Sequence, residues 1–559
     1  MPVKRKRSQV GSPRWLTALS IAVLVIPICL PLLTFQLPSG HDAFSYHPRL
    51  VEFHENITHG IFLPRWAPDL EFGAGQPVFL FTPPLPYYAA ELWRLLGFDS
   101  VVSFNLAAVV TIVASACSMF LFADYQFGRN AAWLAAAAYV WAPYFHVDIF
   151  VRHAFGELAA FPLYPLVLYG FCRYNRERNR RFLLLGAVAW SGIIMTHNPS
   201  ALLFSPLLLA FTIFLGWRGR SLRLTIAMIG GILIGIGLAA FVWLPILAEV
   251  KFVHIERALQ GRLNYADHFV FLEQFLSQDW RYGSSIPGPG DQFSFSLGFG
   301  HLILIPAAVW FVYTSKKRSL RPWLTFLGCS AAILTLMMTP MARWFWDNLP
   351  LLKQVQFPWR ILGDDILVIA ILAGLYGASL EDRARAGIWF WIGIGLLILP
   401  NLTHVGPEQY FPVIAAEWTP RTLAEGGVET TADAEFEPQW VKQRVAYTED
   451  KVLVLSGSAT ISGIQRTPTF WTFESNAQTD TMIEAALLYF PGWTVSVDGR
   501  EIPIEIGNTG RIQFRLPAGM HHVLIEFKRT TVRLAAELVS LSTLFIVIVL
   551  FFRPRLGSK

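Results

Sequence analysis

Ionisable residues that could do chemistry gather in two short stretches beside long apolar runs. The first stretch contains His41 and Asp42, and the second contains Asp148, Arg152 and Glu157. A carboxylate can accept a proton from a hydroxyl group or bind a metal ion, and an arginine side chain binds phosphate through two parallel hydrogen bonds. Charged groups at the edge of the hydrocarbon are costly, and they usually face a cavity or one another. The second stretch is therefore a site candidate.

Three more residues have side chains suited to binding a substrate. His197 follows the apolar run at 182–196, and Arg65 and Arg360 each adjoin Trp and Pro. For each arginine, phosphate binding is one interpretation, and anchoring of the neighbouring Trp at the membrane surface is the other. Arg360 is the better candidate of the two because it lies at the mouth of an expected span. The alternative for His197 is a histidine at a helix end that bonds to the backbone.

The carboxylates also have purely structural interpretations. Asp is a favoured N-cap residue, so Asp42 could cap a helix that we expect near 44–59. If the second stretch is helical, Asp148 and Arg152 are four residues apart and could form an ordinary surface pair. The sequence leaves both interpretations open beside the catalytic one.

The composition places these residues in a membrane protein. Hydrophobic residues make up 54% of the 559 residues. Charged residues make up 15%, against about 25% in soluble proteins, which excludes an ordinary cytosolic enzyme. Twelve apolar runs are candidates for transmembrane helices. They lie at 15–34, 101–123, 131–147, 158–172, 182–196, 200–217, 222–247, 296–314, 323–340, 361–379, 387–402 and 534–552.

Basic residues indicate how the chain is oriented. With the N-terminus in the cytoplasm, about half of the 45 Lys and Arg residues fall in short inside loops and tails, as in 173–181 and 316–321. The net charge of +6 is therefore an orientation signal, and no nucleic-acid partner is expected. The outside loops of interest are then 35–100, 143–157, 248–295 and 341–360.

The chain divides into three parts. We expect a transmembrane domain of eleven helices at 1–402, an extracytoplasmic domain at 403–533, and a last helix with a basic cytoplasmic tail at 534–559. The middle part contains short alternating stretches and turn signals such as Asp498-Gly499. This pattern is typical of an antiparallel β-sandwich, here of about 120 residues.

Several motifs, in their order along the chain, resemble those of one bacterial family. They are Asp42 beyond the first run, Pro64-Arg65-Trp66-Ala67-Pro68, Gly73-Ala74-Gly75-Gln76-Pro77, Pro86-Tyr87-Tyr88, Gln356-Phe357-Pro358-Trp359-Arg360, Tyr489-Phe490-Pro491-Gly492-Trp493, Val497-Asp498-Gly499 and Leu516-Pro517-Ala518-Gly519. Together they resemble the membrane proteins described as 6-pyruvoyl-tetrahydropterin-synthase-related or YfhO-like, whose layout is similar to that of the GT-C glycosyltransferases. The chain departs from the family pattern after Phe527, where Lys528 and Arg529 stand before the final span and such proteins usually show a Pro and a Gly.

The resemblance implies a polytopic helical membrane enzyme of the hexosyltransferase class, with about twelve spans and an outside β domain. Such an enzyme moves a sugar from a polyprenyl-phosphate donor to a glycan, lipid or protein acceptor of the cell envelope, at the outer face of the inner (plasma) membrane. By this layout Asp42 is the base or a metal ligand. Asp148, Arg152 and Glu157 resemble an acidic, basic and acidic series of the relatives.

The residue types and the resemblance together give the candidate roles. Asp42, Asp148 and Glu157 are the catalytic candidates, and His41, Arg65, Arg152, His197 and Arg360 are the substrate-binding candidates. A divalent metal, Mg or Mn, stays open, with Asp42 and Asp148 as the ligands it would use. A transporter or flippase for a lipid-linked saccharide and a non-catalytic protein of envelope-glycan assembly are the two alternative functions.

Overall fold

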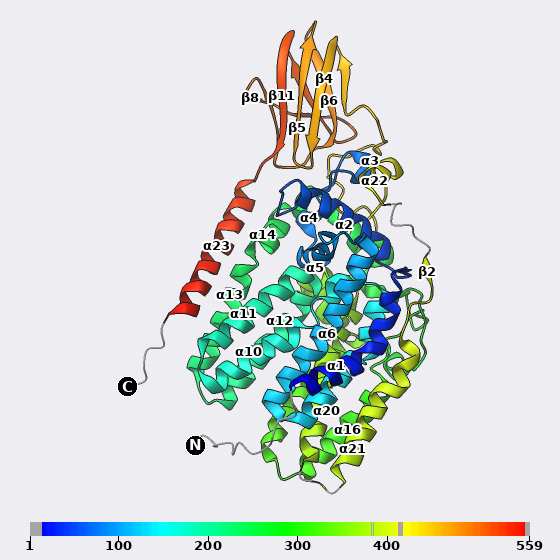
Figure 1. Cartoon of the computed structure of the whole chain (residues 1–559), viewed down its shortest axis with the longest axis vertical. Coiled ribbons are helices and arrows are strands. Elements are labelled where there is room, and N and C mark those ends of the chain that lie inside the picture. Colours follow the sequence, from blue (N-terminus) through cyan, green and yellow to red (C-terminus); the bar gives the residue numbers. More distant parts are fainter. Residues whose placement is uncertain (1–13, 382, 384, 412–417, 554–559) are drawn as a thin grey trace.

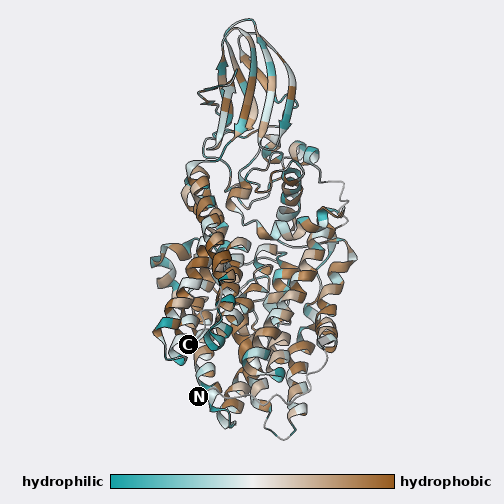
Figure 2. Ribbon diagram, turned by 60° about the vertical axis from the view of Figure 1, so that its left-hand side comes forward, coloured by the Kyte–Doolittle hydropathy of each residue, from teal (hydrophilic) through white to brown (hydrophobic). Residues whose placement is uncertain are grey.

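The computed structural model describes residues 14–381, 383, 385–411 and 418–553 (Figure 1). These residues form a tall bundle of helices with a pair of β-sheets at one end. Hydrophobic residues dominate the helices of the bundle, whereas hydrophilic and hydrophobic residues are mixed in the sheets (Figure 2). The bundle is therefore the part that suits a bilayer, and the protein is a polytopic helical membrane protein with a C-terminal β domain.

Eight helical segments in the described part of the chain are long and apolar enough to cross a membrane. They are α1 (Arg14–Cys29) with η1 (Leu30–Thr34), α6 (Ser100–Phe127), α9 (Phe155–Leu158) with α10 (Leu163–Glu177), α12 (Asn198–Arg218), η7 (Arg318–Leu320) with α17 (Arg321–Met337), η9 (Pro358–Ile361) with α20 (Leu362–Leu380), α21 (Ala386–Ile398) with η10 (Leu399–His404), and α23 (Thr531–Phe552).

Two bent pairs raise this number to ten if each pair is one span. The first is α7 (Arg129–Val140) with α8 (Pro143–His146) and η2 (Val147–Val151), bent by 49°, and the second is α13 (Leu222–Leu238) with α14 (Ala240–Glu249) and η3 (Val250–Phe252), bent by 66°. Helices thus occupy all twelve predicted runs. The number of twelve spans is not confirmed, because α11 (Arg180–Thr196) and α16 (Phe299–Thr314) contain only 17 and 16 residues and a span needs about 20.

Helix α20 is the centre of the bundle. Every residue of this span is buried within the protein, whereas only 6% of the span that ends the chain, α23, is buried. Small residues allow the close contact between α20 and the alanine-rich α7, since a Cβ on Gly377 would lie 2.7 Å from the backbone oxygen of Asn130. The residues at the start of α20 are therefore surrounded by protein, whereas α23 lies largely exposed at the edge of the bundle (Figure 1).

The segments between the bundle and the sheets contain short helices. They are α2 (Ala43–Thr58), α3 (Leu70–Gly73), α4 (Val78–Phe81), α5 (Leu85–Arg94), η4 (Ile255–Leu259), η5 (Gly261–Leu263), η6 (Tyr265–Asp267), α15 (Leu272–Leu276), η8 (Pro340–Ala342), α18 (Arg343–Asn348), α19 (Pro350–Lys353) and α22 (Pro420–Gly426). The helix predicted near 44–59 is confirmed as α2. Strand β1 (Leu37–Pro38) pairs with β2 (Tyr410–Phe411), which joins the first outside loop to the segment after the eleventh predicted span.

The β domain consists of two antiparallel sheets that share one hydrophobic core. Their strand orders are β3-β6-β10-β9 and β4-β5-β11-β7-β8. The strands are β3 (Val452–Ser456), β4 (Ala459–Thr467), β5 (Phe470–Ala477), β6 (Thr481–Leu488), β7 (Trp493–Val497), β8 (Arg500–Ile502), β9 (Glu505–Ile506), β10 (Arg511–Leu516) and β11 (Gly519–Phe527). Phe473 of one sheet and Ile483 of the other are both buried in this core. The sandwich therefore occupies 452–527, and the described residues of the segment before it, 403–411 and 418–451, contain no strand of these sheets.

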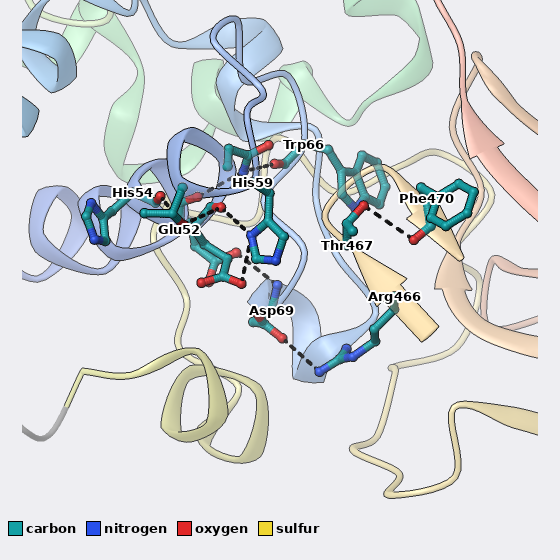
Figure 3. A network of polar contacts seen from close by, with 11 residues as sticks. Glu52, His54, His59, Trp66, Asp69, Arg466, Thr467 and Phe470 are labelled. Carbon is teal, nitrogen blue, oxygen red and sulfur yellow. Dashed lines mark hydrogen bonds and ion pairs between the residues drawn. The ribbon is translucent and has the colours of Figure 1, made fainter. Parts of the chain in front are cut away.

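The β domain docks on the first outside loop. Trp66 is fully buried, and its ring lies 5.4 Å from that of Trp493. Gly75 permits this packing, because its φ is +82° and a Cβ there would lie 2.3 Å from the Trp66 indole nitrogen. Arg466 of β4 lies 3.6 Å from Asp69, whose backbone N–H donates to Glu52 at 2.9 Å (Figure 3). The interpretation of Trp66 as a membrane-surface anchor is wrong, because it packs inside the protein.

Candidate functional site

Arg152 is the centre of a buried polar cluster at the end of the bent α7–η2 pair. Its Nη1 donates to Asp148, to Glu157 Oε2 at 2.7 Å and to the Tyr144 hydroxyl at 3.0 Å. The Tyr144 hydroxyl donates in turn to Glu157 Oε1 at 2.8 Å. Arg152 and both carboxylates are at most 4% exposed. The interpretation of Asp148 and Arg152 as a surface pair is therefore wrong: they are paired, but within the protein.

Local backbone features bring these residues together. Pro143 lacks an N–H, and Ala142 before it is extended, which ends α7 and starts a new direction. Asp148 then lies in the wide π-type turn η2, a local geometry that is frequent at functional sites. Glu157 follows in the first turn of α9 and reaches back to the same guanidinium.

The first outside loop crosses directly over this cluster. The backbone N–H of Asp42 donates to the Arg152 carbonyl at 2.9 Å, and that of His41 donates to the Val151 carbonyl at 3.2 Å. Gly40 makes the crossing possible, since a Cβ there would lie 2.5 Å from the Cβ of His153. Two stretches more than a hundred residues apart in the sequence therefore form one surface.

The Asp42 carboxylate does not cap helix α2, although its position at the start of that helix suggests this role. Asp42 occupies the N-cap position of α2, but its side chain makes no capping hydrogen bond. It is close enough to Arg152 and Arg360 for its charge to act on both guanidinium groups. The N-cap interpretation is therefore wrong for the side chain, and a half-buried carboxylate remains beside two cations.

His41 lies on the same surface. Its Nε2 is 3.1 Å from the Gly283 carbonyl of the third outside loop, and its ring contacts Phe293 at 5.9 Å between centroids. Burial, and next the charge of Arg152, lower the pKa of His41, although Asp42 opposes this shift. A neutral His41 that bonds to a carbonyl is a hydrogen-bonding residue and not a further cation.

Arg360 and His197 complete the cluster from two other elements. Arg360, in η9 before the central helix, donates from Nη1 to Gln356 at 3.1 Å, and its buried Nε has no hydrogen-bond partner among the described residues. His197 lies between α11 and α12, near Glu157 and Arg360, and its Nδ1 is 2.7 Å from the Ser200 hydroxyl. The expected backbone bond of the His197 side chain is thus replaced by a side-chain bond.

Trp359 is a residue of this site that was not among the predicted site residues; the sequence suggested only a membrane-surface anchor. The Arg152 guanidinium lies over its ring at 4.8 Å, and the side chain is 3% exposed. The interpretation of Trp359 as a membrane-surface anchor is therefore wrong. Tyr144 was missed too, although it stands in the second polar stretch. For Trp359, the available signal in the sequence was a Trp next to an Arg at the start of a predicted span.

Arg65 does not join the cluster. Its Nη2 donates to the Phe241 carbonyl of α14 at 2.7 Å, and the charges near it are Arg533, Glu537 and Glu249. The structure therefore brings together seven of the eight predicted site residues and places Arg65 beside the last span. The seven are His41, Asp42, Asp148, Arg152, Glu157, His197 and Arg360.

The carboxylates of the cluster are not arranged as a metal centre. Asp148 is bound by Arg152, and no three His, Cys, Asp or Glu side chains of the described residues come together as ligands. The space next to Asp148 is too tight for a water molecule. A divalent ion, Mg or Mn, at Asp42 and Asp148 stays a prediction.

Comparison with known proteins places the chain in a family. Residues 79–405 match the model described as the 6-pyruvoyl-tetrahydropterin synthase related domain, a membrane protein. An uncharacterized protein of Lactococcus lactis subsp. cremoris (strain MG1363) is 22% identical over 241 residues, which cover 41% of this chain. The chain spans 39% of the length of that relative.

Two solved structures are similar as well. One is ArnT from Cupriavidus metallidurans bound to undecaprenyl phosphate, with 16% identity, a TM-score of 0.42 and coverage of 69% of this chain and 64% of that one. The other is the arabinofuranosyltransferase AftD from Mycobacteria, with 18% identity, a TM-score of 0.46 and coverage of 72% and 28%. The family match covers more than half of the chain, so the protein belongs to the 6-pyruvoyl-tetrahydropterin synthase related family of membrane proteins, as its motifs predicted.

Proposed function

We propose that this protein is a membrane glycosyltransferase that moves a sugar from a polyprenyl-phosphate donor to a hydroxyl group of a glycan, lipid or protein. The observation that supports it is the convergence of the Asp42 carboxylate, which caps no helix, with Arg152 and Arg360. Transfer from a glycosyl phosphate needs a base for the acceptor and cations for the departing phosphate. This surface offers both.

Asp42 is the proposed base. The acceptor oxygen forms a bond to the anomeric carbon while the bond from that carbon to the phosphate oxygen breaks, and the electron pair leaves with the phosphate. The proton of the acceptor hydroxyl passes to Asp42. Asp148, whose Oδ2 has no partner, and Glu157 are the alternative proton acceptors, but both are paired with Arg152.

Arg360 is the proposed phosphate-binding residue. Its buried Nε has no hydrogen-bond partner among the described residues. It can therefore donate to the departing phosphate oxygen, on which negative charge grows. Arg152 already serves two carboxylates and stacks on Trp359, which suits a positioning residue that keeps the site rigid. His41 and His197 are neutral groups for hydrogen bonds to the sugar.

The site is proposed to lie on the extracytoplasmic side of the inner membrane, with both chain ends in the cytoplasm. Arg181, in the most basic turn of the chain, lies over the ring of Phe551 at the far end of α23. That turn is therefore at the opposite end of this span from the β domain. Basic turns mark the cytoplasmic side, which leaves the β domain and the Asp42 surface outside.

The experiment is a comparison of a deletion strain with its parent. We expect the deletion to lose one envelope sugar and to accumulate its lipid-linked donor, and the wild-type gene to reverse both changes. A gene that encodes Asp42→Asn should restore protein level but not the sugar. Unchanged glycans and lipid-linked sugars in the deletion would refute the proposal.

A transporter or flippase is the second candidate, because two carboxylates lie inside the central span. Asp364 and Asp365 are both buried in the first turn of α20, and Asp365 accepts from Thr335 at 2.8 Å. Buried carboxylates often mark a pathway. A flippase would move a fluorescent lipid-linked saccharide across proteoliposomes without any acceptor, whereas a transferase would not.

A further inference from the structure

A cavity with several charged residues in its lining lies beside the last span, away from the Arg152 cluster. It has a volume of about 360 Å³ and lies between the turn 60–65 of the first outside loop, the end of β11 and the start of α23. Its charged lining consists of Arg65, Lys528, Arg529, Arg533 and Glu537. Four cations and one carboxylate thus face one space.

Only some of these cations are neutralised. Arg533 donates from Nη2 to Glu249 at 2.8 Å and to the Pro491 carbonyl at 2.8 Å, so its charge is already paired with a carboxylate. Arg529 is 3.2 Å from Glu537, but its side chain is 69% exposed, and such pairs are weak. Lys528 lies 3.3 Å from Glu501 in a second exposed pair. Even with Glu249 and Glu501 counted, four cations stand against three carboxylates, so the cavity keeps an excess of positive charge.

Arg65 is the buried cation whose charge is least compensated by its neighbours. Its Nη2 donates to the Phe241 carbonyl at 2.7 Å, whereas its buried Nε has no hydrogen-bond partner in the part of the chain that the structure describes. Burial first, and the charge of Arg533 second, lower the pKa of Arg65 to about 10. An anion in the cavity would offset both effects and satisfy the Nε.

The position of the cavity indicates the source of that anion. α23 begins at Thr531, next to the cavity, and its outer face carries the exposed Leu534, Leu538 and Leu541. These leucines face hydrocarbon, so the cavity lies at the level of the lipid headgroups. Phe62, 72% exposed at the rim, adds an apolar surface for an acyl chain.

We propose that this cavity binds the phosphate headgroup of an anionic membrane lipid, with Arg65 and Arg529 as the phosphate ligands and the acyl chains along α23. Lys528 adds attraction from the rim. The site does not depend on the proposed glycosyl transfer, because Arg65 contacts no residue of the Arg152 cluster.

Binding of short-chain probes to the full-length protein in neutral detergent tests this site. The probe is dioctanoyl phosphatidic acid, and titration calorimetry measures its affinity. Dioctanoylglycerol has the same chains without phosphate, and inorganic phosphate has the charge without chains. We expect both to bind at least about tenfold more weakly than the lipid, because each lacks one half of the recognition.

Variants assign the binding to the cavity. Arg65→Gln should lower the affinity for the lipid about tenfold, and Arg529→Gln should lower it about fivefold. Arg515→Gln is the matched control, since Arg515 is an exposed arginine of the β domain that pairs with Glu505 far from the cavity. Arg529 is largely exposed, so its variant reports on binding even if the Arg65 variant folds poorly.

Three results would overturn the proposal. One is wild-type lipid affinity in Arg529→Gln together with wild-type affinity in a folded Arg65→Gln. Another is a loss of lipid affinity in Arg515→Gln as large as that in the cavity variants, which would show nonspecific attraction to a basic surface. The third is inorganic phosphate binding as tightly as the lipid, which would make free phosphate the ligand.

Discussion

Replacement of Arg152 by Met is the most direct test of the buried cluster. The change keeps most of the side-chain length and removes the charge, so Asp148 and Glu157 are left buried without their shared cation. Removal of one partner from a buried ion pair costs about 3–5 kcal/mol, because the remaining charge is not solvated. The stacking on Trp359 is lost as well.

This free energy can be converted to a shift in unfolding temperature. An unfolding entropy of about 2 cal/mol/K per residue, applied to the whole chain, turns about 3–5 kcal/mol into a decrease of about 3–4 °C. The measurement is thermal unfolding of the purified protein in detergent, with every variant scanned at the same rate so that the unfolding temperatures can be compared. Arg515→Gln, in an exposed pair, should stay within 1 °C or so of the wild type.

A double change separates the electrostatic cause from a simple packing defect. Asp148→Asn and Glu157→Gln, added to Arg152→Met, make the cluster neutral and should recover most of the lost stability. The hydrogen bond from the Asp42 N–H goes to the backbone carbonyl of residue 152, so none of these side-chain changes removes its donor or its acceptor. An unfolding temperature of Arg152→Met equal to that of the wild type would refute this account of the cluster. So would a triple variant whose unfolding temperature stays as low as that of Arg152→Met.

Three further predictions concern the reaction and the β domain. Asp42→Asn should lower turnover about 10²–10⁴-fold with unchanged unfolding temperature, because the carboxylate makes no capping bond. Arg360→Ala should lower kcat/KM for the donor about 10–100-fold, as expected for the loss of a hydrogen bond to a charged group. Burial raises the pKa of Asp69 from 3.8 to about 6, and it also raises the pKa of Glu52. Since the folded protein then binds these protons more tightly than the unfolded chain, stability should fall as pH rises from about 4 to about 6, and Asp69→Asn should flatten this decline.

Each of these predictions has a result that contradicts it. Wild-type turnover in Asp42→Asn would remove Asp42 from the mechanism, and Arg360→Lys serves as the charge-preserving control for Arg360→Ala. An unchanged apparent donor affinity and turnover in Arg360→Ala would return that residue to a structural role. For the β-domain contact, unfolding temperatures measured between pH 4 and pH 7 that decline equally in Asp69→Asn and in the wild type would exclude Asp69 as the titrating group.

Local sequence information was sufficient where neighbouring residues decide the structure. The apolar runs predicted helices at all twelve positions, because hydrophobicity over about 20 residues is a local property. The segment 44–59 was predicted as a helix and forms α2. Asp498 and Gly499 were predicted as a hairpin turn, and both have positive φ between β7 and β8.

The sequence by itself determined a membrane protein with a C-terminal β domain and pointed to the two polar stretches that meet at the site. Only the tertiary structure decided that Arg152 is buried between two carboxylates and that Arg65 lies beside the last span. The sequence also could not decide whether Trp66 is buried or lies at the membrane surface, since its partner Trp493 lies more than four hundred residues further along the chain. The physical reason is that burial and pairing depend on side chains brought from distant segments, and neither composition nor periodicity records which segments will pack together.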